Sequence, residues 1–281
     1  MPDIYPKITI IMAVFNSAGT LQRALDSVQA QTWPNKELIV MDGGSNDGSV
    51  EILRDNESSI TYWESKPDRG IYHAWNKALD HATGDWIHFT GADDYFMDPK
   101  VLEHAAQALA LCDKEVTVAY GQMAVVTPRG ELVEINGEPW EISRKRFTRA
   151  MSIPHFALFT RSEVFEIRGK FDESFRIAGD YELLLRELPE SQAMFIPNLL
   201  VKGVLYGGTS TSPSRILTGA LEIAKAKRLN GIWPYDLVWF RILAEASVKY
   251  CLYKVLGDKL TRIVVDLYRR ATGRSAVWTQ P

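Results

Sequence analysis

The feature that most constrains the fold is a seven-residue apolar run at positions 8–14, Ile-Thr-Ile-Ile-Met-Ala-Val. A run so rich in β-branched residues is typical of a central parallel strand that is covered on both faces. Leu21, Leu25 and Val28 then recur at helical spacing, and a second expected strand follows at positions 37–41, Glu-Leu-Ile-Val-Met. A strand, an amphipathic helix and another strand make a βαβ unit, so we expect a parallel sheet with a right-handed crossover.

The alternation of short apolar runs and helical patterns continues to about residue 211. We expect further strands at 60–63, 86–89, 117–120 and 201–206, a hairpin at 124–135, and helices at 71–82, 99–111, 161–167 and from 179. Beyond Pro213 the pattern becomes helical, at 216–229, 237–256 and 260–270. The chain therefore predicts an α/β domain over residues 1–211, with a mostly parallel mixed sheet flanked by helices, and a helical C-terminal extension over 212–281.

The bulk composition is that of an ordinary globular protein, with 281 residues, 46% hydrophobic and 24% charged residues and a net charge of -3. The first residues lack a basic segment followed by an apolar one, and no run of 18 apolar residues occurs. We therefore expect a cytoplasmic protein. Cys112 and Cys251 are expected to be buried thiols rather than a disulfide or a metal site.

Charge is distributed unevenly along the chain. From residue 215 onward there are 12 Lys/Arg and 5 Asp/Glu, a balance of +7, whereas the preceding residues carry 20 and 30, a balance of -10. The helix at 237–256 combines aromatic and basic residues: Trp239, Phe240, Arg241, Lys249, Tyr250, Tyr253 and Lys254. This composition fits an anionic membrane surface as the partner of the extension. The alternative is that these helices pack on the domain or form a dimer; no nucleic-acid module is recognisable, so nucleic acid is not expected as a partner.

Two adjacent carboxylates, Asp93 and Asp94, follow the apolar run at 86–89. In open α/β sheets ligands bind at the carboxyl ends of the strands, so both side chains should stand at the rim of a crevice. Mg²⁺ or Mn²⁺ suits such a place, because hard cations take one or two carboxylates together with substrate phosphates. A turn with a helix cap is the plainer interpretation of the same dipeptide.

A glycine-rich loop, Asp42-Gly-Gly-Ser-Asn-Asp-Gly-Ser49, follows the second expected strand. Nucleotide-binding folds place an acidic residue at this position, and glycines let the backbone approach a ligand closely. The composition is also that of any surface loop. Neither a Walker-type sequence nor Gly-x-Gly-x-x-Gly occurs in the chain, which counts against a P-loop or a dinucleotide site.

Taken together, these motifs resemble the family 2 glycosyltransferases. The resemblance rests on residues 9–16, on Gln31-Thr32-Trp33-Pro34-Asn35, on 37–48, on Asp68-Arg69-Gly70-Ile71-Tyr72 with Asn76-Lys77, and on 82–85 leading to Ala92-Asp93-Asp94. It covers about the first 210 residues. It implies a GT-A fold with a nucleotide-sugar half over about 1–98 and an acceptor half over about 99–211. It also implies inverting transfer from a nucleotide-diphosphate sugar, with a UDP-sugar as the first expectation for the donor. A divalent cation is the implied cofactor.

The resemblance assigns donor-site roles residue by residue. Ala13 and Asn16 would lie beside the base and ribose, and Asp42 would take the base edge. Asp93 would lie near the ribose, and Asp94 would hold the Mn²⁺ or Mg²⁺ that bridges the diphosphate. The loop at Asp68 and the ammonium of Lys77 would lie near the donor. One departure is that many members carry two acids where this chain has Asp42-Gly43, which leaves the ribose contacts and the donor base open.

The expected catalytic base is Asp180, because this family places a catalytic acid at the start of the helix that follows Gly179. Inversion needs one carboxylate to accept the proton of the acceptor hydroxyl, a contribution of about 10²–10⁴-fold to the rate. Read from the local sequence, Asp180 is also a good N-cap for this helix.

The remaining site residues are expected to contact acceptor or phosphate. His155 follows a loop into a strand, and its alternative is a histidine bonded within that loop. Gly208, Thr209 and Ser210 resemble a loop that closes over the diphosphate in relatives, and a plain turn is the alternative.

The sequence thus predicts an inverting, metal-dependent sugar transferase of surface-polysaccharide synthesis. Its acceptor would be a glycan, in particular a lipid-linked one, at the inner face of the plasma membrane. Two rivals remain open. A nucleotidyltransferase would normally carry a basic, glycine-rich loop after the first strand, which residues 15–19 lack. A non-catalytic relative that binds sugar nucleotides would not be expected to keep Asp42, Asp94 and Asp180 together.

Overall fold

A computed structural model of the chain describes residues 5–126, 131–205, 214–273, 276 and 279. In chain order, its strands are β1 (Ile8–Val14), β2 (Lys36–Asp42), β3 (Tyr62–Ser65), β4 (Trp86–Gly91), β5 (Tyr95–Phe96), β6 (Val116–Val126), β7 (Leu132–Asn136), β8 (Leu158–Arg161) and β9 (Gln192–Leu205). Its α-helices are α1 (Ala18–Gln29), α2 (Ser49–Asp55), α3 (Ile71–Leu79), α4 (Val101–Leu111), α5 (Trp140–Phe147), α6 (Glu163–Ile167), α7 (Gly179–Glu187), α8 (Ile216–Leu229) and α9 (Leu237–Ala271). Short 3₁₀ turns cover Glu57–Ser59 and His155–Ala157.

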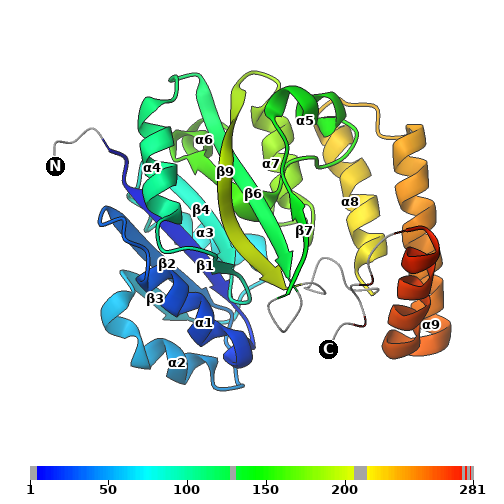
Figure 1. The fold of residues 1–281 in the computed structure, drawn as a ribbon, viewed down its shortest axis with the longest axis horizontal. Helices are drawn as coiled ribbons and strands as arrows, with labels where there is room; N and C mark the ends of the chain where they lie inside the picture. Colours follow the sequence, from blue (N-terminus) through cyan, green and yellow to red (C-terminus); the bar gives the residue numbers. More distant parts are fainter. Residues whose placement is uncertain (1–4, 127–130, 206–213, 274–275, 277–278, 280–281) are drawn as a thin grey trace.

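The strands form one mixed sheet in the order β3-β2-β1-β4-β8-β6-β9-β5, with β7 added beside β6 (Figure 1). β1 pairs in parallel with β2 and β4, and β2 pairs in parallel with β3. β8 is antiparallel to both β4 and β6, while β6 and β9 are parallel. The expected α/β mixed sheet is confirmed, and its N-terminal half is the fully parallel part.

Helices cover both faces of the sheet, and the strands alternate their side chains between them. In β1, Ile8, Ile10 and Met12 are buried against the layer that contains α1, α2 and α4. Ile11 points to the opposite face, into the layer that contains α3, α6 and α7. A strand with both faces buried reads as a continuous apolar run, which is why positions 8–14 could be recognised.

Several boundaries differ from the expected ones for identifiable reasons. The strand expected at 117–120 and the first arm of the hairpin form one strand, β6, because β9 pairs along its whole length. The hairpin itself is confirmed as the antiparallel pair β6 and β7. The helix expected at 161–167 begins at Glu163, because Arg161 is still paired with Trp86 of β4.

The C-terminal extension lies at the end of the molecule opposite β1–β3 (Figure 1). α8 matches the expected range, and α9 breaks at Gly257 (φ 74°, ψ 176°), between the two helices that the sequence predicted. α8 packs on α7, and α9 packs on α8. No helix in the described part of the chain is long and apolar enough to cross a membrane. Both cysteines are free, but the expectation that both are buried is wrong, since Cys251 is exposed on α9.

Candidate active site

The carboxylate of Asp42, the last residue of β2, shapes the glycine-rich loop that follows it. It is fully buried and accepts hydrogen bonds from the amides of Gly44 and Ser45, both at 3.0 Å, and from the hydroxyl of Ser65 at 2.6 Å. The hydroxyl of Ser45 donates to it as well. Asp42 therefore holds the loop in place, and its contact with a nucleotide base stays a prediction.

The loop after β1 is joined to this glycine-rich loop by Asn16. Its side-chain oxygen accepts from the amide of Asn46 at 3.0 Å, and its own amide donates to the hydroxyl of Ser45 at 2.7 Å. Asn16 has φ 48°, a left-handed conformation that asparagine tolerates better than most residues. Ala13 lies just before this loop, on the part of β1 that pairs with both β2 and β4. Ala13, Asn16 and Asp42 thus gather at the carboxyl edge of the parallel strands.

Asp68 fills the space beside Gly43. A Cβ atom at Gly43 would lie 2.7 Å from Oδ2 of Asp68 and 3.2 Å from the ring of Phe15. The other oxygen, Oδ1, accepts from the amide of Gly70 at 2.8 Å. The chain lacks a second acid at position 43, and the carboxylate of Asp68 takes the place that such a side chain would enter.

Lys77 is engaged in an ion pair rather than directed at the loops. Its ammonium lies 2.8 Å from Oε1 of Glu64 on β3, and Lys66 lies 2.7 Å from Oε2 of the same carboxylate. Hydrogen bonds from Lys66 and then Lys77 lower the pKa of Glu64 to about 2. A contact between Lys77 and a donor would require this ion pair to open, and that contact stays a prediction.

The carboxylates of Asp93 and Asp94 converge over Gly91, the last residue of β4. A Cβ atom at Gly91 would lie 2.6 Å from Oδ1 of Asp93 and 3.2 Å from Oδ2 of Asp94. Asp94 is 2% exposed, and its Oδ2 also accepts from the amide of Gly91 at 3.0 Å. Glycine at position 91 therefore leaves the room in which the two carboxylates meet.

This pair of carboxylates fits a hard divalent cation. Both groups offer oxygen, the ligand type that Mg²⁺ and Mn²⁺ prefer, and such ions are commonly completed by substrate phosphates and water. Among the described residues, no cluster of three or more His, Cys, Asp or Glu side chains could hold a metal without such help. Asp94, with Asp93 beside it, is thus suited to a cation that arrives together with a diphosphate.

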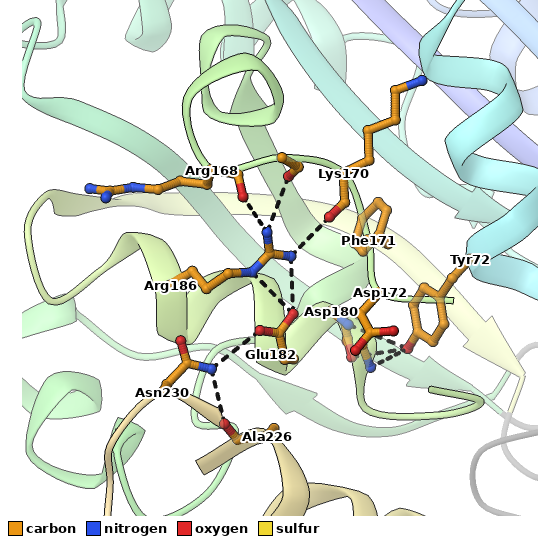
Figure 2. A network of polar contacts seen from close by, with 12 residues as sticks. Tyr72, Arg168, Lys170, Phe171, Asp172, Asp180, Glu182, Arg186, Ala226 and Asn230 are labelled. Atoms are coloured by element: carbon orange, nitrogen blue, oxygen red, sulfur yellow. Dashed lines mark hydrogen bonds and ion pairs between the residues drawn. The ribbon is translucent and has the colours of Figure 1, made fainter. Parts of the chain in front are cut away.

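Asp180 is the second residue of α7, and the N-cap position belongs to Ala178. It is therefore not the N-cap that its local sequence favours. Oδ2 of Asp180 lies 3.4 Å from Nδ1 of His155. The hydroxyl of Tyr72 lies 3.3 Å from Oδ1 of Asp180 (Figure 2). Burial, and then the charge of Asp180, raises the pKa of Tyr72 well above its ordinary value, so its hydroxyl stays protonated as a donor. The carboxylate of Asp180, with an imidazole and a phenol beside it, is placed to accept a proton.

Aromatic rings hold this group against the end of β4. The ring of His155 stacks on Trp75 of α3, with centroids 5.3 Å apart, and lies 6.4 Å from the ring of Phe89. Phe89 precedes Gly91 by two residues on β4, so both point to the same face of the sheet. A small, mainly apolar cavity lies beneath, lined by Phe89 and Phe171 and reached by Asp180 and His155. The Asp93–Asp94 pair and the Asp180–His155 pair thus both lie at the end of β4.

Two residues of this site were not identified from the sequence. Tyr72 was part of a recognised motif but had no assigned role, and its hydroxyl accepts from the amides of Gly179 at 2.8 Å and Asp180 at 3.3 Å. Glu222, on α8, accepts from three further amides at the approach to α7. No local pattern around Glu222 marks it. Gly208, Thr209 and Ser210 lie outside the described residues, and their expected phosphate contact stays a prediction.

The chain is similar in sequence to known glycosyltransferases. Residues 9–165 match the family described as Glycosyl transferase family 2. An uncharacterised glycosyltransferase of Mycobacterium tuberculosis is 35% identical over 184 residues, which cover 64% of this chain and 68% of that protein. Chondroitin synthase of Pasteurella multocida is 30% identical over 210 residues, covering 73% of this chain and 21% of the synthase.

A solved structure has the same fold. The mannosyltransferase PcManGT from Pyrobaculum calidifontis, in complex with GDP-Man and Mn²⁺, superposes with a TM-score of 0.64 at 21% identity, over 97% of this chain and 81% of that one. Together with the sheet order and the loops at its carboxyl edge, these similarities establish a GT-A fold. The chain belongs to glycosyltransferase family 2 and is a glycosyltransferase.

Proposed function

We propose that this glycosyltransferase moves a sugar from a nucleotide-diphosphate sugar to a glycan hydroxyl with inversion, and that Asp180 is the general base. The observation that carries the proposal is the setting of Asp180, whose carboxylate lies beside the imidazole of His155 and the hydroxyl of Tyr72, at the cavity beside β4. The donor would bind along the carboxyl edge of β1, β2 and β4. The loops of Asn16, Asp42 and Asp68 meet there, next to Asp93 and Asp94.

The acceptor oxygen attacks the anomeric carbon from the face opposite the leaving group, and the bond from that carbon to the diphosphate oxygen breaks. The hydroxyl proton passes to an Oδ atom of Asp180, and the neighbouring imidazole of His155 stabilises the proton on the pair. Attack from the opposite face inverts the configuration at the anomeric carbon.

The proposed cofactor is Mn²⁺ or Mg²⁺, held by Asp94 with Asp93 beside it. When bound, the cation would supply charge stabilisation to the departing diphosphate. Support comes from the convergence of both carboxylates over Gly91 and from a structural neighbour solved in complex with Mn²⁺. Two nucleotides are candidates for the donor. UDP is the one that the sequence led us to expect, and GDP is the nucleotide of the GDP-Man bound to that neighbour.

The proposed acceptor is a lipid-linked glycan of surface-polysaccharide synthesis, met at the inner face of the plasma membrane. The support is an apolar stripe on the outer side of α9, in which Leu237, Phe240, Val248 and Val255 are 88%, 53%, 60% and 81% exposed. The extension also carries the net charge of +7, and apolar helices with basic residues bind anionic interfaces. The full chain should float with vesicles that contain anionic lipid, and Leu237→Glu with Val255→Glu should stop this. If that variant floats as well as the unchanged chain, the apolar stripe of α9 is not the membrane-binding surface.

The donor site is tested by calorimetric titration of UDP-, GDP- and dTDP-sugars in the presence of Mn²⁺. We expect one nucleotide to bind, and Asp94→Ala to lose that binding while remaining folded. Hydrolysis of the same donor, with water in place of the acceptor, then tests the base, because Asp180→Asn should lower kcat by about 10²–10⁴-fold. Unchanged hydrolysis in Asp180→Asn would refute the assignment, and no binding by the folded chain would favour a non-catalytic relative.

A further inference from the structure

We propose that Glu222, on helix α8 of the C-terminal extension, is a positioning residue for the carboxylate of Asp180. The inference rests on the proposed function of Asp180 as the base. Oε1 of Glu222 accepts from the amide of Arg176 at 2.8 Å, and Oε2 accepts from the amides of Ile177 and Ala178 at 2.8 and 2.9 Å. These three amides lead directly into α7, in which Asp180 is the second residue.

The hydroxyl of Tyr72 completes this arrangement from the other side. It accepts from the next two amides, Gly179 at 2.8 Å and Asp180 at 3.3 Å, and donates to the carbonyl of Ile177 at 2.7 Å. Five consecutive amides, from residue 176 to residue 180, are thus bound by two side chains from distant elements. Because the path of this backbone sets where the side chain of Asp180 begins, Glu222 and Tyr72 together determine the place of its carboxylate.

α8 is seated on the segment through several contacts, so Glu222 does not rest on a loose surface contact. Glu222 is 8% exposed. One turn earlier, a Cβ atom at Gly219 would lie 3.4 Å from the side chain of Ile177. One turn later, the ammonium of Lys225 donates to the hydroxyl of Ser174 at 2.6 Å and lies 4.0 Å from the ring centroid of Phe175.

The C-terminal end of α8 also reaches α7. The side-chain amide of Asn230 donates to Oε1 of Glu182 at 3.3 Å, and Arg186 lies 3.0 Å from Oε2 of the same residue (Figure 2). α7 is therefore held by the extension near its start and again within its second turn. This places the extension within the support of the active site.

A carboxylate is the group that this place requires. Three backbone N–H groups of the segment before α7 point at Glu222, and an ionised carboxylate can accept from all of them through its two oxygens. Glutamine would keep one accepting oxygen and turn an NH₂ donor toward amides that also donate. We call the hydrogen bonds of Glu222 and Tyr72 to the amides of residues 176–180 the clamp. Glu222→Gln therefore removes part of the clamp with almost no change in side-chain volume.

The test is Glu222→Gln in the full chain, with Glu245→Gln as the matched control. Glu245 lies in the same extension and pairs with Arg241 at 3.0 Å, with 49% of its side chain exposed. Donor hydrolysis gives kcat and KM, titration with the nucleoside diphosphate and Mn²⁺ gives affinity, and thermal unfolding gives the folded fraction. We expect Glu222→Gln to lower kcat by about 10–100-fold. Nucleotide affinity and KM should stay unchanged, and Glu245→Gln should match the wild type in every readout.

Three outcomes would overturn the inference. One is an unchanged kcat in Glu222→Gln, and another is a loss of kcat and nucleotide affinity in proportion to a loss of folded protein. The third needs no variant: amides 176–178 of the folded wild type would exchange with deuterium as fast as an exposed loop. If instead Asp180→Asn keeps full activity, the proposed base fails, and the exchange measurement still reports on the clamp.

Discussion

Replacement of Tyr72 by phenylalanine tests the other half of the clamp around α7. Tyr72 is 3% exposed, and its hydroxyl donates to the carbonyl of Ile177 at 2.7 Å while accepting from the amide of Gly179 at 2.8 Å. Phenylalanine keeps the ring and its packing, so the change removes these bonds with little new cavity. The buried amide of Gly179 and the carbonyl of Ile177 would then lack a partner.

The magnitude follows from these two groups. A buried polar group that loses its partner costs about 1–3 kcal/mol, and the long bond from the amide of Asp180 at 3.3 Å adds little. We expect the free energy of unfolding to fall by about 3 kcal/mol, which for a chain of this size lowers Tm by about 6–12 °C. We also expect kcat for donor hydrolysis to fall by about 10²-fold, because Asp180 loses its fixed position.

The matched control is Tyr181→Phe on the neighbouring residue of α7. Tyr181 is 1% exposed and donates to the carbonyl of Phe147 at 2.6 Å, on the side away from the clamp. It should lose about 1–2 kcal/mol of stability and keep its kcat. Thermal and urea unfolding with donor hydrolysis decide between the variants. Equal kcat in Tyr72→Phe and Tyr181→Phe, or a stability loss below about 0.5 kcal/mol for Tyr72→Phe, would refute the reasoning.

Two further predictions concern carboxylates on the sheet. Gly91→Ala would place a methyl group 2.6 Å from Asp93 and 3.2 Å from Asp94, so Mn²⁺-dependent nucleotide binding should fall at least 10-fold with the fold retained, as calorimetry would show. Glu64 has its pKa lowered from 4.5 to about 2 by hydrogen bonds from Lys66 and then Lys77. Its contribution to stability is full above pH 4.5 and is lost as the pH falls toward 2. The wild type should lose part of its urea midpoint as the pH falls through that range, and Glu64→Gln should show a weaker pH dependence. Parallel plots of midpoint against pH for the two proteins would contradict the pairing of Glu64 with the lysines.

Local periodicity was sufficient to predict the parallel half of the fold. Positions 8–14 and 38–41 are apolar apart from Thr9 because helices cover both faces of these strands, so their pattern could be recognised without knowledge of the partners. The extent of β6 could not be predicted in this way. Its continuation from Tyr120 to Val126 depends on pairing with β9, which lies more than 60 residues further along the chain.

The candidate site was predictable where it lies at strand ends. Asp42 and Asp94 end or follow strands that the sequence marked clearly, so their place at the carboxyl edge followed from the topology. The ion pair of Lys77 with Glu64 could not be predicted from the topology, because it joins a side chain of α3 to a side chain of β3. Glu222 was also beyond reach, since its partners are 44–46 residues away and its own helix has an unremarkable pattern.

α3 connects the donor loops to the proposed base. Its first residues follow the loop of Asp68, whose carboxylate lies against Gly43 of the glycine-rich loop. Tyr72, the second residue of the helix, binds the amides at the start of α7, and one turn later Asn76 exchanges two hydrogen bonds with the backbone of Phe171. A shift of α3 would therefore move the donor loop and the carboxylate of Asp180 together. Because Glu222 binds the same segment from α8, the proposed base lies between the contacts of α3 and those of the C-terminal extension. We expect loss of either support to reduce turnover more than donor binding.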